Sequence, residues 1–223
     1  MYSTDLTTIS LETFEEDILS VDLIPSRRVL ADRISDVVPA LADRGVEDLE
    51  GLRRLLREKH GYPDLAVELG VDEQYLTVLN REVNAYVSKS VSLDRLGVFT
   101  DAELESLHTA GITSSRALYE RCCRAAERAE FRAELGLDEK RLALAVDLGD
   151  LVRINGVGPA FARFLHDLGI QGPSDLNSID STDVLDRYHE SIAAAPTPGP
   201  SLRLEDLEYC RRFSLHLSDD VER

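Results

Sequence analysis

The feature that most constrains this chain is an internal repeat with one fixed spacing. Residues 41–46 (Leu-Ala-Asp-Arg-Gly-Val) recur as 107–112, and residues 68–73 (Glu-Leu-Gly-Val-Asp-Glu) recur as 134–139. The displacement of the glycine is the same in both motifs, since 111 − 45 = 66 and 136 − 70 = 66. A third copy of the first motif follows at 165–170, after a shorter step of 169 − 111 = 58. A displacement shared by two motifs predicts a duplicated unit, followed by a shorter related one.

Each copy of the first motif is typical of one helix ending and another beginning. Gly45, Gly111 and Gly169 suit the left-handed backbone conformation that ends a helix, and the β-branched residue after each would return to the core. Apolar positions recur at helical spacing, and no segment has a strand pattern. The sequence therefore predicts an all-α fold in which tandem helix-hairpin-helix-like repeats pack as a compact helical array.

These patterns divide the chain into six segments. Residues 1–24 form an acidic amphipathic helix, which either packs on its own domain or serves as a docking arm. Leu204, Leu207 and Phe213 are expected to face inward from the last segment. The predicted segments are the N-terminal helix or arm (1–24), a first degenerate repeat (25–92), a second repeat (93–150), a helix-hairpin-helix unit (151–192), a proline-rich linker (193–201) and a closing helix (202–217).

Charge is strongly unbalanced. The chain has 25 Lys and Arg against 42 Asp and Glu, a net charge of −17, and its only lysines are Lys59, Lys89 and Lys140. Such an acidic surface normally argues against nucleic-acid binding. In a salt-adapted (halophilic) protein, however, acidity is a general solubility feature, and a GC-rich genome would also replace Lys by Arg. Net charge alone therefore does not select the ligand.

The most specific local pattern is Gly-Val-Gly-Pro at residues 156–159. Two glycines permit a tight turn, and a proline suits the first turn of the following helix. Unpaired amides at a helix start, together with the helix dipole, form an anion site that a nucleic-acid phosphate fits. The alternative is that the loop is only a tight interhelical turn. The binding residues predicted around this hairpin are Arg153, Asn155, Gly156, Val157, Gly158 and Arg163.

A second basic feature lies earlier in the chain. Arg121, Arg124 and Arg128, with Arg132 beyond them, are spaced by three or four residues and so predict a stripe on one helix. The stripe could follow a phosphate backbone. Equally, its arginines could pair with the glutamates of the same helix.

The residues from Leu107 to Leu217 resemble a family of tandem helix-hairpin-helix proteins catalogued as domain of unknown function 4332. The resemblance rests on Gly111-Ile112, the Glu-Leu-Gly-Leu-Asp-Glu segment, Asp150 to Gly158, Leu168-Gly169-Ile170 and the late closing helix. It implies an all-α fold related to helical modules of DNA repair and recombination proteins, and it implies no reaction. Ala160 departs from many DNA-binding hairpins, which place Lys or Arg at that position.

No enzyme motif is present, and the three cysteines have no metal-ligand spacing. We therefore expect a non-enzymatic protein without metal or cofactor. No apolar run is long enough to cross a membrane and no signal peptide is evident, so a cytoplasmic location is expected. The favoured function is sequence-independent binding of a nucleic-acid backbone, most simply DNA. The alternative is a protein-protein interaction adaptor without a nucleic-acid role, which offers a partner its acidic surface or its N-terminal helix.

Overall fold

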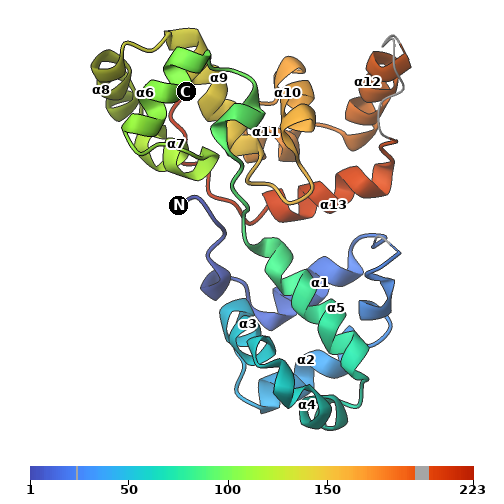
Figure 1. Cartoon of the computed structure of the whole chain (residues 1–223). Helices are drawn as coiled ribbons and strands as arrows, with labels where there is room; N and C mark the ends of the chain where they lie inside the picture. The colour runs from blue at the N-terminus through green and yellow to red at the C-terminus, as the bar shows by residue number, and fades with distance from the viewer. Residues whose placement is uncertain (24, 194–200) are drawn as a thin grey trace.

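The structure is a computed structural model that describes residues 1–23, 25–193 and 201–223. Within these ranges it contains thirteen α-helices, five short 3-10 segments and no β-strand (Figure 1). The predicted all-α class is therefore confirmed. None of the helices in the described part of the chain combines the length and the apolar character needed to cross a membrane.

The first five helices surround one hydrophobic core. The acidic helix α1 belongs to it, because Phe14 and Ile18 on its apolar face are fully buried. That face is therefore not available to another protein, and α1 packs on the first core, whereas Tyr2 earlier in the segment packs in the second core. The helices are α1 (Leu11–Leu19), α2 (Ile34–Asp43), α3 (Leu49–Arg57), α4 (Tyr62–Leu69) and α5 (Glu73–Val83).

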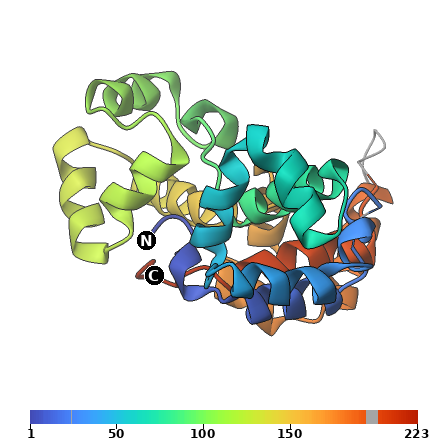
Figure 2. The same ribbon diagram turned by 90° about the horizontal axis from the view of Figure 1, so that it is seen from below.

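The next seven helices surround a second core. Figure 2 shows α6, α7 and α8, coloured green to yellow, to one side of the remaining helices. The helices are α6 (Asp101–Thr109), α7 (Ser115–Cys122), α8 (Ala125–Leu135), α9 (Glu139–Leu151), α10 (Pro159–Asp167), α11 (Pro173–Ser178) and α12 (Ser181–Ala193).

The repeated first motif ends a helix in the same way in each of its copies. Gly45, Gly111 and Gly169 have φ values of 85°, 81° and 85°. In each copy the amide of the next residue bonds to a carbonyl five residues back, as in Val46 to Leu41 at 3.0 Å. The equivalent distances are 2.9 Å from Ile112 to Leu107 and 3.0 Å from Ile170 to Leu165. The predicted glycine stop is confirmed in every copy.

The second motif also builds the same local structure twice. Gly70 and Gly136 both have φ of 64° and end α4 and α8. Two residues later, Asp72 and Asp138 accept backbone hydrogen bonds at the starts of α5 and α9. Because this aspartate satisfies an amide that has no partner inside its helix, the Gly-apolar-Asp sequence both ends one helix and begins the next.

Helix α13 (Leu204–Ser214) joins the two cores. Leu207 and Cys210 belong to the second core, whereas Phe213 belongs to the first. In both ribbon views α13, in red, passes beside the helices of the first core (Figures 1 and 2). The prediction that Leu204 faces inward is wrong, since it is 42% exposed at the first helical position while packing begins one turn later. The proline-rich linker lies, for residues 194–200, outside the described part of the chain.

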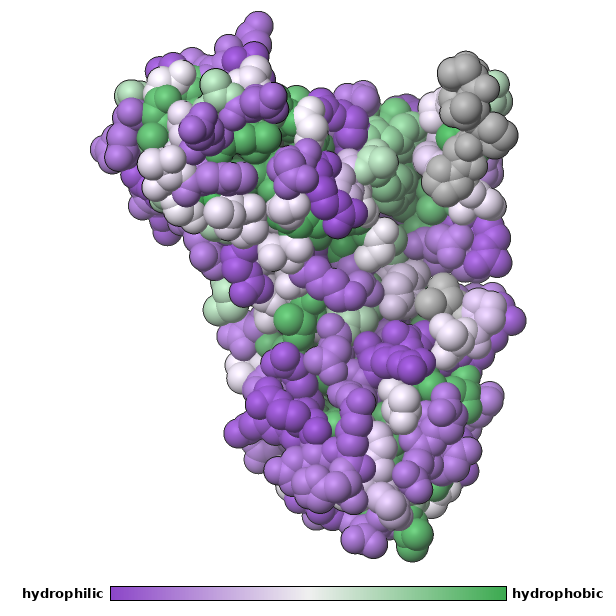
Figure 3. Space-filling model, viewed as in Figure 1, coloured by the Kyte–Doolittle hydropathy of each residue, from purple (hydrophilic) through white to green (hydrophobic). Residues whose placement is uncertain are grey.

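The surface in view is predominantly hydrophilic, as the net charge of −17 requires. Figure 3 shows that the part formed by α1–α5 is largely covered by hydrophilic residues, with more hydrophobic surface showing in the part formed by α6–α12.

Candidate nucleic-acid interface

The loop that carries the predicted anion site connects α9 to α10 across residues 152–158. Two apolar side chains anchor it, because Ile154 is 1% exposed and Val157 is 5% exposed. The Val157 amide donates to the Ile154 carbonyl at 3.0 Å, which closes the turn. Val157 therefore supports the loop from the core and does not itself face a ligand.

The two glycines of the loop have different structural roles. Gly156 has φ of 94°, and a β-carbon there would lie 2.6 Å from the sulfur of Cys210 on α13. Gly158 has ordinary extended angles and open space where a β-carbon would lie. Gly156 is thus required by backbone conformation and packing, whereas Gly158 keeps the start of α10 uncovered.

The first turn of α10 presents amides without internal partners. No hydrogen bond inside the described residues uses the amides of Gly156, Gly158, Ala160 or Phe161, and no side chain caps the helix. Gly156, Gly158 and Ala160 are exposed. Pro159 occupies the first helical position, where it has no amide to satisfy. The helix start therefore has free donors and the positive end of a helix dipole.

The equivalent helix start one unit earlier is closed. Thr100 caps α6 by accepting from the Glu103 amide, and the Glu103 carboxylate accepts from the Thr100 amide in return. A carboxylate already occupies the place where an external anion would bind. The start of α10 is thus open where the equivalent start of α6 is closed, and α2, α4 and α8 also begin without a side-chain cap.

Arg153 does not face solvent, which corrects its prediction as a phosphate contact. Its side chain is fully buried, forms an ion pair with Asp150, and stacks over the Tyr119 ring at 4.5 Å. Its guanidinium also donates to the Tyr2 carbonyl at 2.8 Å and to the Ser218 carbonyl at 3.1 Å. The donors of Arg153 therefore hold segments near both ends of the chain.

Asn155 and Arg163 are the polar side chains of the hairpin that reach the surface. Both are partly exposed. The Asn155 amide donates to the Tyr209 hydroxyl at 3.3 Å, and Arg163 has no ion-pair partner within the described residues. Arg163 therefore carries a charge that is free to meet an anion.

The predicted arginine stripe is not continuous, because α7 ends at Cys122 and a separate helix, α8, begins at Ala125. Arg121 lies on α7 near Glu134, Arg124 lies between the helices near Glu222, and Arg128 lies on α8. Arg128 donates to the carbonyls of Cys122 and Glu222. Each of these three arginines has a partner within the molecule, although the Arg124 side chain remains largely exposed, and their division between two helices removes the continuous stripe that the spacing predicted.

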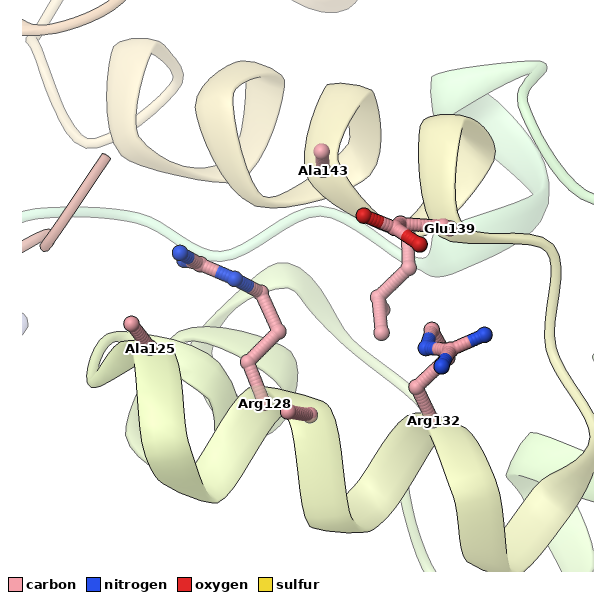
Figure 4. A pocket seen from close by; sticks show the side chains of 7 residues that line it. Ala125, Arg128, Arg132, Glu139 and Ala143 are labelled. Atoms are coloured by element: carbon pink, nitrogen blue, oxygen red, sulfur yellow. The ribbon is translucent and has the colours of Figure 1, made fainter.

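Arg128 and Arg132 instead line a pocket of about 320 Å³ between α8 and α9. Figure 4 shows both side chains rising from α8, with Glu139 and Ala143 on the facing helix. The Glu139 carboxylate opposes an anion there, so this pocket is a weaker candidate than the hairpin.

The sequence did not predict a network of buried charges that lies next to the hairpin. Asp147 and Asp150, on α9, form ion pairs with Arg223 at 3.1 and 2.8 Å. Burial raises the pKa of the Asp150 carboxyl, while Arg153 and Arg223 lower it in part. The sequence signal for this network is the presence of two aspartates within the apolar run 144–152. A helix that is buried on several sides needs cations from elsewhere in the chain to pair with such aspartates.

Among the described residues, no cluster of His, Cys, Asp and Glu has the arrangement of a metal site.

The structure defines an all-helical protein in which an exposed interhelical loop leads into an uncapped helix start. Residues 97–191 match the family described as Domain of unknown function (DUF4332), which confirms the resemblance noted in the sequence. The match includes α6 to α11, the hairpin and most of α12, and leaves out the first core and α13. Neither the comparison with curated proteins nor the comparison with solved structures returned a match.

Proposed function

We propose that this protein is a non-enzymatic helix-hairpin-helix protein that binds a nucleic-acid backbone without reading its sequence. The observation that carries the proposal is the open start of α10, where the Ala160 and Phe161 amides have no internal partner. A phosphate oxygen accepts hydrogen bonds from such amides and is attracted by the helix dipole. Because this contact involves only the phosphate, it carries no base specificity.

Two further features support the same function. Arg163 lies one turn into α10 without an ion-pair partner in the described residues. In addition, Gly156 and Gly158 are exposed beside the helix start. The helix-hairpin-helix character of the other units is part of this proposal, and the closed start of α6 suits a structural role for the second unit.

A pair of substitutions at Gly158 tests the proposal without disturbing the fold. Gly158→Asp places a carboxylate where it can cap α10 internally, as Thr100 and Glu103 cap α6. The backbone angles of Gly158 accept a side chain, so this variant should fold at least as stably as the original. Gly158→Ala adds a β-carbon but no acceptor and serves as the matched control.

Binding of a random-sequence 20-base-pair DNA duplex should be measured by fluorescence anisotropy over a salt series. We expect Gly158→Asp to weaken binding by roughly tenfold or more, which corresponds to the loss of one dipole-assisted anion contact. Gly158→Ala should bind like the unmodified protein, and affinity should fall steeply as salt rises. A duplex and a single strand that both fail to bind at low salt would instead favour the adaptor function.

A further inference from the structure

A second pocket lies where the two cores meet. Its volume is about 400 Å³, and both halves of the molecule contribute to its wall. The first half supplies a segment around the end of α5, and the second half supplies the hairpin loop and α13. The lining residues that bear on the argument are Arg27, Arg81, Lys89, Asn155, Gly156 and Tyr209.

The charge of this pocket is opposite to that of the molecule. Arg81 and Lys89 are exposed and have no ion-pair partner within the described residues. Arg27 contacts the buried carboxylate of Glu82 at 2.8 Å, but Glu82 is shared with Arg212. One carboxylate therefore faces two guanidiniums, and the cations Arg81 and Lys89 are uncompensated. In a chain of net charge −17, such a concentration of positive charge creates a local potential that attracts anions.

The wall also offers donors suited to a phosphate. The Gly156 amide has no internal partner, and the Asn155 side chain lies beside the Tyr209 hydroxyl. Gly156 is common to this pocket and to a cavity of about 240 Å³ that includes Ala160 and Phe161 at the start of α10. One extended polyanion can therefore contact the helix start and the junction pocket together.

The junction that forms the pocket is held by buried groups. Arg212, on α13, pairs with Glu82 of α5, and its guanidinium lies 4.6 Å from the centre of the Phe213 ring. Cys210, two residues earlier on α13, packs against Gly156. The segments that carry the cations of the first half are therefore held beside the hairpin of the second half.

We propose that the junction pocket binds a phosphate group, held by Arg81, Lys89 and the Asn155–Gly156 segment. The phosphate belongs either to a nucleic-acid backbone or to a free phosphate compound, because both offer the same tetrahedral oxyanion. Only the first source rests on the proposed function. With a nucleic acid, the pocket provides a second contact on the same strand as the start of α10.

The test compares two double variants of equal charge change. Arg81→Ala with Lys89→Ala removes both uncompensated pocket cations. Arg57→Ala with Lys59→Ala removes one exposed arginine and one exposed lysine from the same half, outside the pocket, and is the control. Each protein is titrated with the 20-base-pair duplex over a salt series, and separately with inorganic phosphate while the backbone amide signals of Gly156 and Lys89 are followed by NMR.

We expect the pocket variant to bind the duplex roughly tenfold more weakly, while the control binds like the original protein. The slope of log affinity against log salt concentration should become shallower by about one to two for the pocket variant, because one or two phosphate contacts are lost. Phosphate should shift the Gly156 and Lys89 signals in the original protein and not in the pocket variant. If the duplex does not bind but phosphate still shifts these signals, the pocket proposal stands for a free anion and the nucleic-acid function fails. If the duplex binds equally to both double variants and phosphate shifts neither signal, the pocket proposal is wrong, whatever Gly158→Asp shows.

Discussion

At the scale of single residues, Gly156 links the hairpin to α13. Its φ of 94° lies in the region that side chains disfavour, and its missing β-carbon leaves room for the Cys210 sulfur. Burial also raises the pKa of the Cys210 thiol to about 12, so this cysteine stays protonated at neutral pH. The same glycine therefore allows the turn, the packing of α13 and the exposed amide.

We expect Gly156→Ala to destabilise the protein by about 2–3 kcal/mol, the cost of a strained backbone together with a steric clash. Gly169→Ala is the matched control, because Gly169 has φ of 85° but open space around its β-carbon position. Gly169→Ala should lower the free energy of unfolding only by the cost of the strained backbone, about 1 kcal/mol. Urea unfolding followed by circular dichroism measures both free energies.

Combining Gly156→Ala with Cys210→Ala separates the two parts of the cost. The change at Cys210 should reduce the additional cost of the Gly156 substitution if contact with the sulfur causes it. Equal costs for Gly156→Ala and Gly169→Ala would show that packing of α13 against the loop does not matter.

At the scale of helices, Glu103 connects the starts of α6 and α9. It completes the cap with Thr100, and its carboxylate accepts from Arg141 at 3.0 Å. Burial by itself would raise the pKa of Glu103, but the hydrogen bonds from Thr100 and Arg141 outweigh it and lower that pKa to about 2. The folded state therefore favours the ionised carboxylate.

The contribution of the ionised Glu103 to the free energy of unfolding should be fully present above the ordinary pKa of 4.5. It should be lost as the pH falls from 4.5 towards 2. We expect Glu103→Gln to lower the free energy of unfolding at pH 7 and to flatten its decline over this acid range. Glu105→Gln, an exposed position on the same helix, is the control and should leave the pH profile unchanged. Thermal unfolding at several pH values provides the measurement, and parallel profiles for Glu103→Gln and the original protein would disprove the assignment.

At the scale of the whole molecule, α13 makes one structure out of two cores. The Arg212 guanidinium is buried beside Glu82 and lies over the rings of Tyr209 and Phe213. It also donates to the Asp17 carbonyl of α1 at 3.3 Å. These contacts join the C-terminal helix to the first five helices.

We expect Arg212→Ala to destabilise the protein by about 3 kcal/mol, because among the described residues it leaves the buried Glu82 carboxylate with Arg27 as its one guanidinium partner. Arg212→Met with Glu82→Gln keeps the side-chain volume and removes both charges, so it should cost less. Unfolding monitored by circular dichroism should also show two transitions for Arg212→Ala and one for the original protein. A loss below about 1 kcal/mol would show that this pair does not hold the junction.

Local structure was largely readable in the sequence. The glycine stops at Gly45, Gly111 and Gly169 and the interhelical turn at Gly156-Val157-Gly158 depend on residues within a few positions of one another. Backbone conformation at a glycine and apolar spacing along a helix are local properties, so a repeated motif determines them wherever it occurs. The all-helical class follows from the same reasoning.

The tertiary structure decided which charges are free. Arg153 looked like a phosphate contact, yet it is buried against Asp150, while Arg81 and Lys89 meet the hairpin across the junction from far earlier in the chain. Sequence spacing cannot show this, because the electrostatic role of a side chain depends on partners that are brought together only when the two cores pack around α13.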